Sequence, residues 1–173
     1  MGSTISEKIL AKHSSQEQVE AGDVVVCSVD YAMMTDTRSV NAIQMIGKLG
    51  SKSLSFAGQT AMVMDHYSPP PNEEAAQIHT TMRAFAKETG TKLYDIGEGI
   101  CHQVLPEGGH LTCGDLTVGT DTHSVTYGAF NAFGTGIEGT DVSAVMASGK
   151  IWLRVPETCL LYTSDAADDT PCV

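Results

Sequence analysis

The chain contains the stretch Leu116-Thr117-Val118-Gly119-Thr120-Asp121-Thr122-His123-Ser124. The apolar alternation over its first four residues predicts a β-strand at 116–119. The strand ends at an acid, a hydroxyl and an imidazole, and open α/β sheets place their ligands at the carboxyl ends of the strands. Because Asp, Thr, Ser and Gly also form ordinary turns, this stretch alone is compatible with either a site or a turn.

Two other segments end in a similar way. The strand expected at 61–65 ends in Asp65 and His66, and the strand expected at 92–96 is followed by a segment that contains His102. Three predicted strands therefore each deliver a histidine near their carboxyl ends, and two of them also deliver an aspartate. A single histidine is more often structural, but three at equivalent strand ends favour a functional cluster.

The rest of the pattern alternates helices with strands. Helical periodicity and capping residues predict helices over 5–12, 40–49, 73–89 and about 140–153. Ser3 or Thr4 is expected to cap the first helix and Asn72 the third. A run of valines predicts a buried strand at 23–29, and the glycine-rich segment 134–139 is expected to be a tight turn. The alternation predicts an α/β fold of three layers, α/β/α, with a mainly parallel sheet.

Composition excludes several classes of protein. The chain has 173 residues, enough for one domain with a core, and a formal net charge of −11, which argues against nucleic acid and anionic membrane surfaces as partners. It has no apolar run of membrane-spanning length and no secretory signal. Cys27, Cys101 and Cys113 show no C-x-x-C spacing and no disulfide-scaffold density, so we expect a reducing, cytoplasmic location.

The motifs occur together, in one order, in a known family. They are the Asp-His pair after the strand at 61–65, E-G-I-C-H-Q at 98–103, G-T-D-T-H-S-x-T-Y-G-A-F at 119–130, and the segment 140–158. In this order they resemble the aconitase superfamily, in particular the large subunits of 3-isopropylmalate dehydratases and homoaconitases. The resemblance implies that residues 1–158 form the N-terminal part of the iron–sulfur domain. It also implies a hydro-lyase that dehydrates and rehydrates a 2-hydroxy di- or tricarboxylate, as in leucine biosynthesis.

The resemblance assigns roles to five candidate catalytic residues. Asp65 and His66 would form the acid pair that protonates the departing hydroxyl group. His102 would pair with Asp121, and His123 would complete the hydrogen-bonded shell around bound water. An aspartate suits an adjacent histidine because the carboxylate fixes the imidazole tautomer and raises its basicity.

Three further residues are expected to bind substrate, and two of them depart from the family pattern. Thr35 stands before Asp36 where the family usually has glutamine, and Thr122 replaces the serine of the family's D-S-H motif. Ser124 is the third. The two departures indicate a divergent member whose substrate need not be isopropylmalate.

The family also implies groups that this segment does not supply. A [4Fe-4S] cluster provides the Lewis acid in the full-length enzyme, and its three cysteines are expected beyond the matched segment. We therefore expect no cluster, and no metal ligands, on this fragment alone. The catalytic serine base is expected on a small swivelling subunit, which would be the protein partner beside the hydroxy-carboxylate substrate. The fragment alone should be inactive.

The tail at 159–173 does not resemble the family. It begins Cys159-Leu-Leu-Tyr-Thr-Ser-Asp-Ala-Ala-Asp168, which resembles the translation of a transposon adapter used in DNA libraries. We therefore expect a non-native tail that contributes nothing to the fold.

Two other functions remain open from the residues. In the first, His66, His102, Asp121 and His123 are direct ligands of zinc or manganese in a mononuclear or dinuclear metallohydrolase, which would bind metal without any cysteine. In the second, the chain is a non-catalytic α/β protein that keeps the fold for interaction. A C…C-x-x-C set further along the gene would establish the iron–sulfur alternative.

Overall fold

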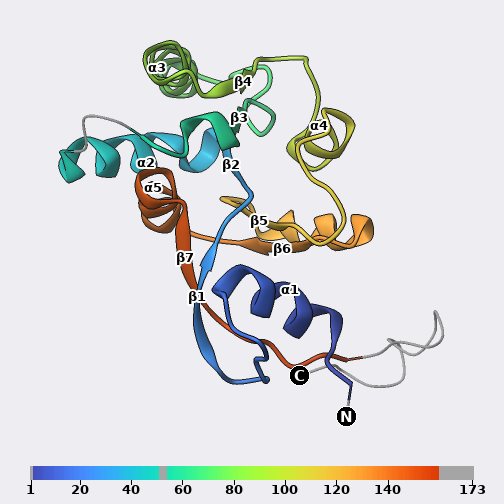
Figure 1. Ribbon diagram of the computed structural model, residues 1–173. Helices are drawn as coiled ribbons and strands as arrows, with labels where there is room; N and C mark the ends of the chain where they lie inside the picture. The colour runs from blue at the N-terminus through green and yellow to red at the C-terminus, as the bar shows by residue number, and fades with distance from the viewer. Residues whose placement is uncertain (1, 51–53, 160–173) are drawn as a thin grey trace.

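Five strands form a single parallel sheet in the computed structural model, which describes residues 2–50 and 54–159 (Figure 1). The strand order is β4-β3-β2-β5-β6. The strands are β2 (Tyr31–Thr35), β3 (Thr60–Val63), β4 (Lys92–Tyr94), β5 (Leu116–Gly119) and β6 (Phe133–Gly136). Each neighbouring pair is parallel, so the carboxyl ends of all five strands lie at the same edge of the sheet.

Helices cover both faces of this sheet, which confirms the predicted three-layer α/β/α arrangement (Figure 1). One face carries α2 (Asp36–Leu49), α3 (Glu73–Thr89) and α5 (Gly139–Ser148). The other carries α4 (Cys101–Glu107) and the 3₁₀ helix η2 (Thr122–Phe130). No helix within 2–50 and 54–159 is long and apolar enough to cross a membrane.

The side chains of β2 show how the two cores are separated. All five residues of this central strand are buried. Ala32 and Met34 pack toward α2, α3 and α5, whereas Tyr31 and Met33 pack toward α4 and η2. Since successive side chains of a strand point to opposite faces, the central strand is apolar throughout. Its carboxyl end is therefore held rigidly between two packed layers.

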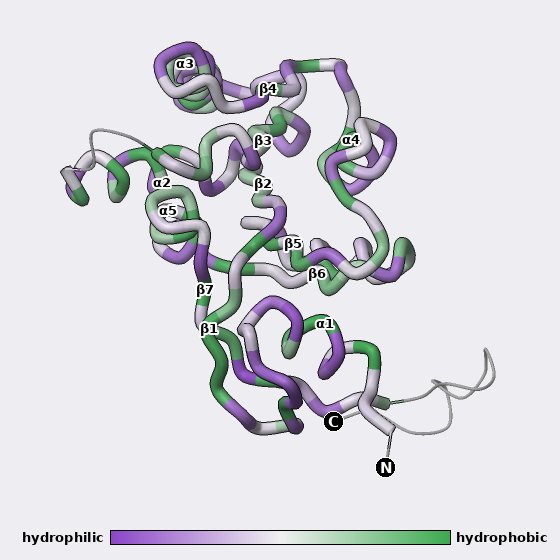
Figure 2. The backbone as a smooth tube through the Cα atoms, viewed as in Figure 1, coloured by the Kyte–Doolittle hydropathy of each residue, from purple (hydrophilic) through white to green (hydrophobic). Residues whose placement is uncertain are grey.

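An antiparallel ribbon stands apart from the sheet, formed by β1 (Val24–Ser28) and β7 (Lys150–Arg154), with α1 (Ile5–Ser14) against it (Figure 1). The prediction of a buried strand at 23–29 is wrong in its burial, because residues alternate between exposed and buried along β1. Figure 2 shows the hydrophobic character of this strand. Val24, Val26 and Trp152 are all more than half exposed, whereas Val25 is buried.

Capping residues set the ends of the helices that the sequence predicted well. The Thr4 hydroxyl accepts a hydrogen bond from the Glu7 N–H while the Glu7 carboxylate accepts one from the Thr4 N–H, so Thr4 caps α1. Asn72 caps α3, and its side-chain oxygen accepts from the Ala75 N–H at 2.9 Å. The helix then runs to Thr89, as predicted.

Two predicted elements are wrong in type over part of their length. The helix expected at 140–153 stops at Ser148, because Gly149 adopts a left-handed conformation with φ of 69° and the chain then enters β7. The expected tight turn at 134–139 instead contributes residues 134–136 to β6. Its glycines fit a confined space, since a Cβ at Gly134 would collide with the backbone oxygen of Ser124.

Other elements were predicted with different limits or not predicted at all. Helix α2 begins at Asp36, four residues before the predicted start, and β2 and α4 were not predicted. The expected strands at 61–65 and 92–96 correspond to the shorter β3 and β4, the former preceded by the 3₁₀ turn η1 (Ala57–Gln59). The predicted tail begins at Cys159, and residues 160–173 lie outside the part of the chain that the structure describes.

Candidate active site

The five candidate catalytic side chains meet at the carboxyl edge of the sheet. Asp65 and His66 follow β3, and Asp121 follows β5 after Thr120. His102 lies in the first turn of α4 and His123 in the first turn of η2. The parallel topology therefore places residues that are far apart in sequence within hydrogen-bonding distance of one another.

Asp121 is the centre of this cluster. Its Oδ1 lies 2.8 Å from His102 Nε2, and its Oδ2 lies 3.2 Å from His66 Nε2. The backbone N–H of His123 donates to Oδ1 at 2.8 Å, and the His123 ring Nδ1 lies 3.2 Å from the same oxygen. Burial raises the pKa of Asp121, but the hydrogen bonds from His123, His102 and His66 outweigh it, and the pKa is lowered. Asp121 is thus a carboxylate at neutral pH.

His66 lies between two carboxylates. Its Nδ1 is 2.7 Å from Asp65 Oδ1, and its Nε2 faces Asp121. Burial lowers the pKa of His66, but the hydrogen bond and charge of Asp65 and the hydrogen bond of Asp121 outweigh burial, so the pKa is raised. Because both ring nitrogens face acceptors, the geometry favours the doubly protonated imidazolium.

Asp65 is fixed by a backbone contact from α4. Its second oxygen accepts from the Cys101 N–H at 2.7 Å. The fully buried Tyr127 donates its hydroxyl to the Cys101 carbonyl at 3.2 Å and so holds the start of α4 against η2. These supports were missed by the sequence analysis, since a backbone N–H leaves no signal in residue type.

The chain is similar in sequence to known proteins. A profile of the Aconitase family (aconitate hydratase) matches residues 7–164. The chain belongs to the aconitase family. It is 46% identical, over 91% of its own length and 38% of the relative's, to the 3-isopropylmalate dehydratase large subunit 1 of Methanopyrus kandleri. Large subunits of 3-isopropylmalate dehydratase from Moorella thermoacetica and Aquifex aeolicus are 43% and 41% identical over 92% and 91% of the chain, and 38% and 37% of those relatives.

This member of the aconitase family spans less than two fifths of the length of those relatives. The matched part contains the sheet and all eight of the candidate site residues.

The three residues expected to bind substrate differ in accessibility. Thr35 is fully buried, with its N–H donating to Thr120 Oγ1 at 2.9 Å and its hydroxyl 2.9 Å from that of Thr37. Ser124 is also fully buried, and its hydroxyl has no hydrogen-bond partner among the described residues. Thr122 is exposed. Of the three, only Thr122 presents its side chain at the open surface of this site.

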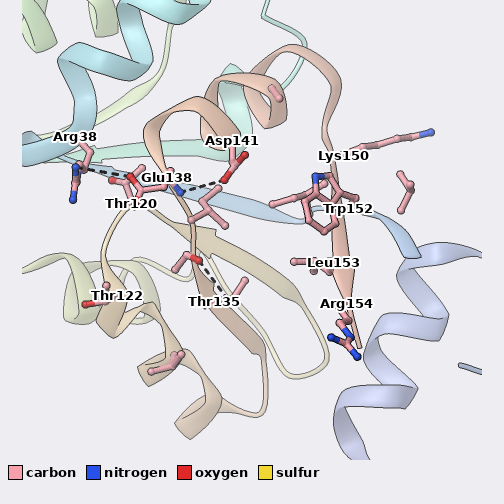
Figure 3. Close-up of a pocket in the computed structure, with 16 residues that line it drawn as sticks. Arg38, Thr120, Thr122, Thr135, Glu138, Asp141, Lys150, Trp152, Leu153 and Arg154 are labelled. Carbon is pink, nitrogen blue, oxygen red and sulfur yellow. Dashed lines mark hydrogen bonds and ion pairs between the residues drawn. The ribbon is translucent and has the colours of Figure 1, made fainter. Parts of the chain in front are cut away.

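A cleft of about 750 Å³ is lined by Thr120 and Thr122, the residues on either side of Asp121 in the sequence (Figure 3). Apolar residues of the β1–β7 ribbon, of η2 and of the segment after β6 form much of its wall, among them Val26, Val125, Ile137 and Trp152. Arg38, Lys150 and Arg154 also line it, with Arg38 lying 3.8 Å from Glu138. Glu138 and Asp141 line it as well, so the cleft carries charges of both signs.

Two groups of side chains in the cluster have the spacing of metal ligands. They are His102, Asp121 and His123, and separately Asp36, Asp65 and His66, each with ligand atoms within 4.8 Å of one another. Neither group, within residues 2–50 and 54–159, contains a cysteine. Cys27 and Cys101 are buried, and burial raises the pKa of the Cys101 thiol. The described residues therefore do not offer a three-cysteine set for an iron–sulfur cluster.

Proposed function

We propose that the chain is the N-terminal part of a hydro-lyase large subunit acting on a 2-hydroxy di- or tricarboxylate of the 3-isopropylmalate type. The observation that carries the proposal is the Asp121 carboxylate shared by His66, His102 and His123 at the carboxyl edge of the sheet. Identity of 46% to a protein named as a 3-isopropylmalate dehydratase large subunit supports the same reaction.

The cluster is suited to the difficult step of dehydration. Hydroxide is a poor leaving group, so a positioned proton donor lowers the barrier to its departure. His66 is such a donor: its raised pKa favours the protonated ring, and its side chain is 34% exposed, so the proton can be passed outward. Asp65 and Asp121 hold the ring in place and stabilise its charge. His102 and the exposed His123 extend the hydrogen-bonding surface toward bound substrate.

The complete enzyme is proposed to use the [4Fe-4S] cluster of the family, which supplies a Lewis acid for the hydroxyl group when bound. The described cysteines do not form a set of cluster ligands, so we assign none of them to the [4Fe-4S] cluster. A small subunit carrying the catalytic base, and a cytoplasmic location, complete the proposal. The residues of this chain would contribute the proton donor, His66, and the carboxylates that orient its ring.

A metallohydrolase is the second candidate, favoured by the metal-ligand spacing of the two side-chain groups. Three variants of the complete protein separate the two functions: His66→Ala, His102→Ala and His123→Ala. For a hydro-lyase, each should lower turnover of 3-isopropylmalate by about 100-fold or more while bound iron is retained. For a metallohydrolase, each should remove the metal together with the activity.

A matched control is His110→Ala, since His110 stacks on Tyr31 at 4.7 Å and lies outside the cluster. It should keep both turnover and iron. If the three histidine variants lose iron in proportion to turnover, the proposed roles of these histidines are overturned.

A further inference from the structure

Behind the cluster lies a buried acid–histidine pair to which the proposed function assigns no role. Asp36 begins α2 directly after β2, and His79 lies in the middle of α3. Both residues are only 1% exposed, and His79 Nε2 is 3.2 Å from Asp36 Oδ2. A buried carboxylate is costly unless it is paired and hydrogen-bonded, so these bonds have a large effect on the local structure.

Asp36 binds the turn that carries His66. The backbone N–H of His66 donates to Asp36 Oδ1 at 3.3 Å, and the N–H of Tyr67 donates to Oδ2 at 2.9 Å. His66 Nδ1 lies 3.8 Å from Oδ1. One carboxylate thus restrains two consecutive peptide units after β3 and also places negative charge beside the imidazole.

His79 in turn orients Asp36. Its Nε2 faces Oδ2, the same oxygen that accepts from Tyr67. Its buried Nδ1 has no partner among the described residues, which fits a neutral ring that carries its proton on Nε2 and donates it to Asp36. Without this donor, the carboxylate would keep only the two bonds from backbone N–H groups and would be held less firmly.

We infer that Asp36 and His79 are positioning residues that hold His66 between Asp65 and Asp121. Both residues act through the turn that carries His66: Asp36 binds the backbone of His66 and Tyr67, and His79 orients Asp36. The inference rests on the proposed function, in which His66 donates the proton. A shift of about 1 Å in a reacting group costs about 100-fold in rate, so a loosened turn should affect turnover strongly.

The test in the complete enzyme compares three substitutions on α3. His79→Leu removes the donor, whereas His79→Gln keeps an N–H of similar reach. Met82→Ala is the matched control, since Met82 is buried in the same helix and packs in the apolar core. We expect kcat to fall about 10- to 100-fold in His79→Leu, with KM changed by less than about threefold. We expect His79→Gln to restore most of kcat, and Met82→Ala to lower the midpoint of thermal unfolding but not kcat.

Equal loss of kcat in His79→Leu and Met82→Ala would overturn the inference, because it would show an effect of stability alone. Failure of His79→Gln to rescue would do the same. If His79→Leu does not fold, Asp36→Asn replaces it, since this substitution keeps the shape of the side chain but removes its charge and one acceptor. It should give the same loss of kcat.

A second measurement does not depend on activity. In the 173-residue chain, the Tyr67 amide should exchange its hydrogen about 10-fold faster in His79→Leu than in the wild type, the effect of losing about one hydrogen bond. His79→Gln and the Met62 amide of the neighbouring strand serve as controls. Unchanged Tyr67 exchange in both His79→Leu and Asp36→Asn would overturn the inference. If the wild-type enzyme does not turn over 3-isopropylmalate but the variants still show faster Tyr67 exchange, the proposed function is refuted. The inference that Asp36 and His79 position the turn at His66 then still holds.

Discussion

Asp121 and His102 form a 2.8 Å hydrogen bond between Oδ1 and Nε2, although they lie on different elements, β5's carboxyl end and the first turn of α4. The same carboxylate faces His66 through its other oxygen. Two imidazoles are therefore oriented by one acid, and a change at Asp121 should affect both.

Asp121→Asn tests this coupling directly. The amide has one acceptor oxygen and one donor group, so at least one imidazole loses its partner. We expect the pKa of His66 to fall, because one of the carboxylates that raise it has been neutralised. Turnover of the complete enzyme should fall about 100-fold or more. ¹⁵N NMR titration of the chain gives the pKa, and steady-state kinetics of the complete enzyme give kcat.

The control for this substitution is Asp115→Asn. Asp115 accepts from the Thr112 N–H in the turn before β5 and lies outside the cluster. Asp115→Asn should leave both the pKa of His66 and kcat unchanged. A wild-type pKa for His66 in Asp121→Asn would contradict the described geometry.

The raised pKa of His66 also predicts how stability depends on pH. A histidine whose folded pKa exceeds its unfolded value of about 6.5 stabilises the fold fully below that value. The stabilisation is lost as pH rises through the folded pKa. The free energy of unfolding of the wild type should therefore exceed that of His66→Gln by more at pH 6 than at pH 9. Urea denaturation at the two pH values measures this, and a constant difference would rule out the ion pairs with Asp65 and Asp121.

Particular residues show how far sequence reasoning reaches. The length of α3 was predictable because its cap at Asn72 and its apolar periodicity are local features. The position of the cluster was predictable because Asp65, His66 and Asp121 follow parallel strands, whose ends share one edge. Strand β7 could not be predicted, because a short apolar run is compatible with either a helix or a strand. Its pairing decides the matter, and Trp152 pairs with Val26, which is far away in sequence.

The roles of Asp36 and His79 behind the cluster could not be predicted from the sequence either. Asp36 binds His66 through a backbone N–H, and no pattern of residue types reports such a bond. His79 lies on the buried face of an amphipathic helix, where a histidine is usually a structural residue. Its partner becomes evident only once α3 is packed against α2.

Shortening a side chain should affect the free energy of unfolding differently on the two faces of the β1–β7 ribbon. Ile151 is 9% exposed and packs in the core, whereas the neighbouring Trp152 is 67% exposed. Ile151→Ala should destabilise the chain by about 2–4 kcal/mol, through lost burial and the cavity that remains. Trp152→Ser should change the free energy of unfolding by about 0.5 kcal/mol or less. Chemical denaturation followed by circular dichroism compares the two variants without using the tryptophan signal, and similar losses would show that Trp152 is covered in solution.

Gly119 should tolerate no side chain, for a reason that involves the site. A Cβ at this position would collide with the Ser124 hydroxyl and lie 2.9 Å from the Met33 methyl group. Gly119→Ala should therefore cost about 1–3 kcal/mol by overpacking. Gly58→Ala is the control, since nothing lies within 4 Å of its added Cβ. Ser124→Ala removes the closest atom, so the double variant Gly119→Ala/Ser124→Ala should be more stable than the sum of the single effects predicts. Additive losses in this double-mutant cycle, measured by urea denaturation, would show that the end of β5, which leads to Asp121, is not packed against Ser124.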